Sequence, residues 1–155
     1  MTIAECQVET MKHIENVRKY IRLFTNRLTQ RGVAHDRLKL ESPEVEIFTE
    51  YTPKLAGATY GSEEYKGFLK EMDVALQHHY AHYRHHPEHF EHGIDDMNLL
   101  DIVEMLCDWK AASLRHHDGN LLKSIERNAK RFGYGDQPKQ ILMNTAVLLD
   151  EFENE

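Results

Sequence analysis

Cysteine is scarce in this sequence, and long apolar runs are missing altogether. Cys6 and Cys107 are the two cysteines among 155 residues, so they form no disulfide framework, and a reducing cytoplasm is the simplest setting. No stretch approaches 18 apolar residues, which excludes a transmembrane helix, and we expect no membrane partner. The N-terminal residues include acids and a histidine where a signal peptide needs an apolar run, so export is not expected.

Basic residues are also outnumbered, with 19 Lys and Arg against 26 Asp and Glu, for a formal net charge of -7. Proteins that bind duplex nucleic acid usually carry a basic excess, so this sequence disfavours that function. Hydrophobic residues make up 41% of the chain, enough to bury a core. The length predicts a single domain over residues 1–155.

Strand signals are weak, because Val and Ile are scattered without sustained alternation. Helix signals recur instead. In residues 3–30 the side chains of His13, Val17, Ile21, Phe24 and Leu28 share one helical face. The glycine at position 32 is expected to end this helix.

Capping residues predict the remaining helices. Ser42 with Pro43 opens a short helix to about residue 51, where the next proline, Pro53, stops it. Ser62 caps a longer helix that runs into a histidine cluster, and a proline at 87 ends or kinks it. Asn98 begins a helix over 99–115, followed by helices over 120–131 and 136–151. The sequence therefore predicts an all-α, compact bundle of five to six helices.

Histidine is abundant, with eleven residues, of which six lie between His78 and His89. If this segment is helical, His79, His82 and His86 fall near one face. Histidine is a poor helix former, so its concentration here favours metal binding or proton transfer over packing. A pH-sensing surface or an adventitious metal-binding tract is the alternative.

Two further segments pair imidazole with carboxylate or place acids on an apolar helix. His35 and Asp36 are adjacent and could bind one divalent ion, or they could form a solvated loop pair. Glu104 and Asp108 are four residues apart, so they project from one side of a largely apolar helix. A bound cation would relieve their mutual repulsion, and a nearby Lys or Arg is the alternative. His13 is either a further ligand or a buried, hydrogen-bonded histidine.

The order of these segments, His13, then His35-Asp36, then Asp108, resembles that of the HD-domain metal-dependent phosphohydrolases. The run from His35 to Lys39 is similar to the family's HDxxK pattern, and His85-His86 looks like the double histidine of its two-metal branch. The GYP run of that branch is absent, as is a histidine between Asp36 and Gln77, so cyclic-dinucleotide specificity is not implied and His79 stands in for the missing ligand. The chain also looks like a small uncharacterised family from phages and bacteria.

The resemblance implies an HD-like bundle that binds one or two divalent transition-metal ions, Mn, Fe, Co, Ni or Zn. The implied ligands are His13, His35, Asp36, His79, His85, His86 and Asp108. A metal-activated water would hydrolyse a nucleotide or another small phosphate ester. Lys39 and Arg84 would bind its phosphate, and Lys39 and Glu104 would assist catalysis.

Two other functions remain open at this point. HD-type relatives that hold a di-iron centre carry out oxygenation, and His and Asp ligands suit iron as well. A non-enzymatic metal-binding or interaction module is the other alternative. The apolar stripe over Ile141–Leu149 either closes the bundle or forms a homodimer seam.

Overall fold

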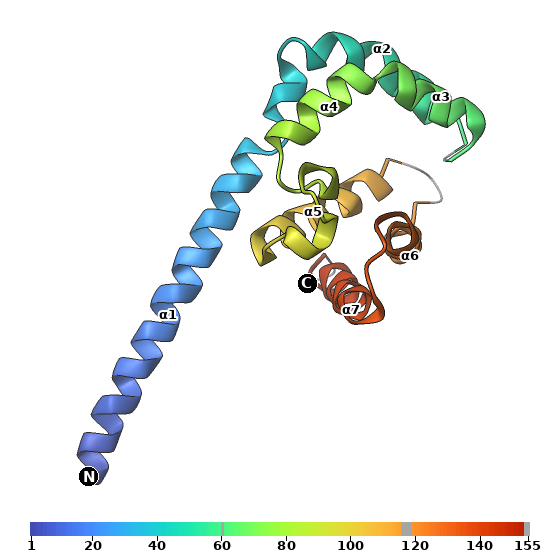
Figure 1. Cartoon of the computed structure of the whole chain (residues 1–155). Coiled ribbons are helices and arrows are strands. Elements are labelled where there is room, and N and C mark those ends of the chain that lie inside the picture. Colours follow the sequence, from blue (N-terminus) through green and yellow to red (C-terminus); the bar gives the residue numbers. More distant parts are fainter. Residues whose placement is uncertain (60, 116–118, 154–155) are drawn as a thin grey trace. The chain divides into compact units, whose positions relative to one another are not determined.

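The computed structural model describes residues 1–59, 61–115 and 119–153, and in these ranges every regular element is helical. The fold is therefore all-α, as predicted (Figure 1). Short 3-10 helices precede or separate several of the α-helices. The α-helices are α1 (Ile3–Ala34), α2 (Glu44–Gly57), α3 (Glu63–Glu71), α4 (Asp73–His82), α5 (Leu99–Ser113), α6 (Leu121–Phe132) and α7 (Asp136–Phe152).

The chain divides into two compact units, residues 1–35 and 36–155. The first unit is the single continuous helix α1 with His35 at its C-terminal end (Figure 1). Thr2 and Glu5 form a capping box at its start, in which each side chain bonds the other residue's backbone N–H. The helix continues through Gly32 to Ala34, so the predicted end at Gly32 is wrong. None of the described helices in the chain is both long enough and apolar enough to span a bilayer.

The second unit begins with a 3-10 helix (Arg37–Leu40) and then α2. The predicted stop at Pro53 is wrong, because α2 continues through it to Gly57. Proline removes one helical N–H, which leaves the carbonyl of Thr49 without its usual partner. Thr49 is exposed, so water can hydrogen-bond that carbonyl.

The predicted long helix from Ser62 consists of two helices, α3 and α4. Ser62 caps α3 as expected, and its Oγ accepts a hydrogen bond from the N–H of Tyr65. The fully buried Met72 lies between the two helices, with φ and ψ of -83° and 0°. The second helix, α4, ends at His82, and the segment that follows contains 3-10 helices over Pro87–His89 and Gly93–Asp96.

Helices α5, α6 and α7 enclose the main hydrophobic core. Asn98 caps α5 as predicted. Met105 and Ile125 are completely buried, and Leu142 is 3% exposed. Trp109 packs against this core. The apolar stripe on α7 is divided between the core and the surface, because Ile141 is exposed while Leu142 is buried.

Candidate metal centre

Three histidines from α4 and the segment after it converge in the second unit. Helix α4 ends at His82, and the chain then takes an extended path through Tyr83. This change of direction returns the chain toward α4, so that the Nε2 atoms of His79 and His86 lie 2.9 Å apart. His79 and His85 are each 1% exposed. The histidines therefore converge because α4 ends at His82. The predicted arrangement, in which His79, His82 and His86 share one face of a continuous helix, does not form.

Asp36 lies at the point where these imidazoles meet. Its Oδ1 is 3.2 Å from His79 Nε2 and 3.5 Å from His85 Nε2. Its Oδ2 accepts a hydrogen bond of 2.6 Å from the ammonium group of Lys39. Asp36 has a φ of 54°, a left-handed conformation that costs an ordinary residue energy but that Asp tolerates better than most. Strained backbone of this kind concentrates at functional sites.

Two buried carboxylates lie behind the histidines, on the sides away from Asp36. His79 Nδ1 is 2.9 Å from Glu44 Oε2, and His85 Nδ1 is 3.1 Å from Glu104 Oε1. Because a carboxylate oxygen accepts hydrogen bonds, the His79 ring donates its Nδ1–H to Glu44, and His85 Nδ1 lies beside the carboxylate of Glu104. The Nε2 atoms of both rings are then directed toward Asp36. Metal-ligating histidines in proteins usually have such a carboxylate or carbonyl partner on the second nitrogen.

Helix α5 contributes acids to the same region. Glu104 and Asp108 lie one turn apart on α5, as the sequence predicts. A carboxylate oxygen of Asp108 lies within 4.8 Å of one from Asp36. Burial is the main cause of a lowered pKa at His86, and the negative charge of Asp108 partly opposes that lowering. The two predicted acids therefore belong to the same region as the histidine cluster.

The electrostatics of the centre hold Asp36 and His86 in the forms that bind metals. Burial opposes ionisation of Asp36, but the ring nitrogens of His79 and His85 beside its Oδ1, together with Lys39, outweigh it and hold the pKa of Asp36 well below its usual range. Burial is also the largest effect on His86, and together with the electrostatic influence of His85 and His79 it lowers the pKa of His86 to about 3. Asp36 is thus anionic and His86 neutral at pH 7.

The donor atoms lie close enough together to hold a metal ion. Asp36, His79, His85 and His86 each present one ligand atom, and these four atoms lie within 4.8 Å of one another, so the group could hold a metal ion. The three atom pairs given above are 2.9–3.5 Å apart. Bonds of about 2.0–2.1 Å to a tetrahedral ion place neighbouring ligand atoms about 3.3 Å apart, which lies inside that range.

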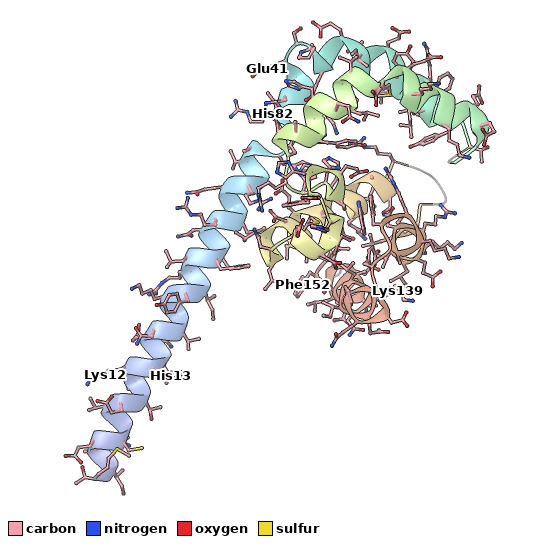
Figure 2. The ribbon with its side chains drawn as sticks, viewed as in Figure 1. Lys12, His13, Glu41, His82, Lys139 and Phe152 are labelled. Carbon is pink, nitrogen blue, oxygen red and sulfur yellow. The ribbon has the colours of Figure 1, made fainter. Side chains whose placement is uncertain are left out.

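Two of the predicted ligands lie in the first unit. His13 is exposed in the middle of α1, and Figure 2 shows its side chain on the helix surface. It lies 22 residues before His35, which at 1.5 Å per residue is about 33 Å along the helix. His13 and His35 therefore cannot bind the same ion in one chain, which corrects the predicted ligand set. His35 precedes Asp36 directly in the chain, but it is the last residue of the first unit. The metal centre of Asp36, His79, His85 and His86 consists of residues of the second unit.

Arg84 uses its guanidinium group within the fold. Its Nε and Nη2 donate to the two carboxylate oxygens of the fully buried Asp101, at 3.1 and 3.0 Å. The guanidinium also lies over the ring of Phe90. Asp101 in turn accepts a hydrogen bond from the backbone N–H of Asn98 at the start of α5. Arg84 thus joins the histidine segment to α5, whereas the sequence suggests a phosphate contact.

Comparison with known proteins places the whole chain in one family. A family model described as a family of unknown function, DUF5662, matches residues 2–154. The chain belongs to DUF5662. No curated protein and no solved structure shows significant similarity to it.

In this DUF5662 protein the sequence identifies Asp36 and all three converging histidines but misses Glu44 and the role of Tyr83. Glu44 is the first residue of α2, a position where acids are common for reasons unrelated to function. The hydroxyl oxygen of Tyr83 accepts a hydrogen bond of 2.8 Å from the N–H of Leu38, two residues after Asp36. This bond ties the histidine segment to the Asp36 segment, and only the tertiary structure reveals it.

Proposed function

We propose that this protein is a metal-dependent phosphohydrolase that acts on a nucleotide or another small phosphate ester. The observation that carries the proposal is the convergence of three imidazole nitrogens on the carboxylate of Asp36. Neutral imidazole with carboxylate is a ligand set suited to Zn, Fe, Co, Ni and Mn. The order of Asp36, then His85-His86, then Asp108 along the chain agrees with an HD-type centre, although His13 does not contribute.

The charge of the site favours a metal-dependent reaction. Carboxylates from Asp36, Glu44, Glu104 and Asp108 surround the histidines, and Lys39 supplies one positive charge beside Asp36. A phosphate ester would be repelled by this excess of acids unless a cation were bound. A divalent ion would supply that charge, lower the pKa of a bound water and polarise the phosphoryl group.

Individual side chains would then have separate tasks. His79, His85, His86 and Asp36 would hold the ion. Lys39, whose ammonium group already lies beside Asp36, would donate hydrogen bonds to a phosphoryl oxygen of the substrate. Asp108 is available on the neighbouring helix as a further ligand or as a base that takes a proton from the attacking water.

Elemental analysis of the purified protein, followed by a screen of phosphate esters with the metal found, tests this proposal. We expect at least one equivalent of metal and metal-dependent release of phosphate. Asp36→Asn should lose both, because the amide is a poor ligand, while the circular dichroism spectrum keeps its helical form. The control Asp95→Asn changes an exposed acid on another segment and should keep both.

Other results would identify the alternatives. An air-sensitive pair of iron ions without phosphatase activity would contradict hydrolysis and favour an oxygenase. A tightly held metal without turnover, whose removal unfolds the protein, would favour a structural metal site. Full hydrolytic activity in Asp36→Asn would show that the reaction takes place elsewhere.

A further inference from the structure

Glu44 is a completely buried carboxylate with both oxygens engaged by histidines. Its Oε1 is 2.8 Å from His78 Nδ1, and its Oε2 is 2.9 Å from His79 Nδ1. Burial of a carboxylate removes its hydration, which is costly unless hydrogen bonds and charges replace the lost water. Here the two imidazoles and the N-terminus of α2, where the helix dipole is positive, compensate that cost.

The contact with Glu44 decides which nitrogen of His79 carries the proton. A neutral imidazole has one N–H donor and one lone pair. With its proton on Nδ1 facing Glu44, His79 presents the lone pair of Nε2 to Asp36 and His86, at 3.2 and 2.9 Å. The opposite tautomer would direct an N–H into the centre and would exclude a bond from His79 to a metal ion.

His78 fixes the orientation of the Glu44 carboxylate. His78 engages Oε1 while His79 engages Oε2, so rotation of the Glu44 carboxylate would break at least one of two hydrogen bonds. His78 is about a third exposed, with 30% of its side chain accessible, and its Nδ1 contacts Glu44. His78 therefore contributes to the centre through Glu44.

We infer that Glu44 is a positioning residue that holds His79 in the tautomer and orientation required for metal binding. The inference rests on the metal centre of the proposed function but does not depend on the reaction that the centre catalyses. Carboxylate partners of ligating histidines typically affect metal affinity by 10–100-fold.

The test compares Glu44→Leu and Glu44→Gln with the parent. Affinity for Zn²⁺ is measured by competition with a chromophoric chelator, and the tautomer of His79 is read from its ring ¹⁵N shifts in the metal-free protein at pH 8. Leucine provides no acceptor, so we expect an affinity loss of about 100-fold and a change in the His79 tautomer. Glutamine can turn its oxygen to His79 and its amide to His78, so we expect about a 10-fold loss with the Nδ1–H tautomer retained.

Glu46→Leu is the matched control, because Glu46 is an exposed acid in the same first turn of α2. It should change neither affinity nor tautomer. The glutamine variant also guards against misfolding, since it preserves the shape of the buried side chain.

Each remaining outcome separates the inference from the proposed function. Parental affinity in Glu44→Leu would overturn the inference, as would a loss of affinity with His79 unchanged. Absence of Zn²⁺ binding in the parent would overturn both the inference and the proposed function. Zn²⁺ binding that depends on Glu44, in a protein that hydrolyses no phosphate ester, would leave the inference standing and would remove the hydrolase proposal.

Discussion

Replacement of Arg84 by Met should destabilise the protein, because it leaves the buried carboxylate of Asp101 without two hydrogen bonds. Hydrogen bonds to charged groups contribute about 1.5–3 kcal/mol each. The Arg84 side chain is 47% exposed, so solvent screening brings the combined effect below the sum of two such bonds. We expect a loss of about 2 kcal/mol in the free energy of unfolding, or about 4–8 °C in Tm. Met keeps the apolar stem that packs near Phe90.

Chemical denaturation of the parent, Arg84→Met and Arg84→Lys measures this effect. Lys keeps the charge but cannot form the bidentate contact, so its loss should be intermediate. Removal of the carboxylate by Asp101→Asn should reduce the further cost of Arg84→Met, since the two residues interact directly. An Arg84→Met protein with parental stability and a raised KM for a phosphate ester would refute this reasoning. It would assign Arg84 to the substrate instead.

Three further predictions concern the metal centre. Tyr83→Phe removes the acceptor for the Leu38 N–H, so it should lower stability by about 1 kcal/mol and weaken metal binding. His86 has a pKa of about 3 in the folded chain but near 6.5 when unfolded, so the unfolded state binds more protons between those values. The metal-free parent should therefore lose about 2 kcal/mol more stability than His86→Asn between pH 7.5 and 5. His13→Ala should leave metal affinity unchanged.

Denaturation and chelator competition check these predictions, with His82→Ala as the control for the loss of an exposed histidine. Equal metal affinity in Tyr83→Phe and the parent would show that the Tyr83 contact does not position Asp36. If the free energy of unfolding changed with pH by the same amount in His86→Asn and in the parent, the low pKa of His86 would be contradicted. Loss of metal binding in His13→Ala would contradict the separation of His13 from His35 along α1.

Local signals predict much of the helical fold. Asn98 and Ser62 cap helices as their sequence positions indicate, because capping depends on neighbouring backbone groups. Pro53 fails as a stop signal, since an exposed carbonyl in the preceding turn tolerates the missing N–H. The break at Met72 carries no signal in the sequence, because it depends on tertiary burial of that side chain.

The chemical types at the site are easier to predict than their arrangement. The abundance of histidine and the His35-Asp36 pair direct attention to the right segments of the second unit. Helical periodicity cannot show that His85 and His86 reach His79 through a change in chain direction after His82. Glu44 is missed because its function depends on a contact 35 residues away along the chain. His13 is wrongly predicted as a ligand, because helical spacing shows which residues share a face but not what that face contacts.

Anomalous X-ray diffraction from crystals of the metal-loaded protein tests the central claim most directly. The account predicts an ion bonded to Nε2 of His79, His85 and His86 and to a carboxylate oxygen of Asp36, at about 2.0–2.2 Å. Anomalous density confined to exposed histidines such as His82 or His92, with none among these four side chains, would contradict it.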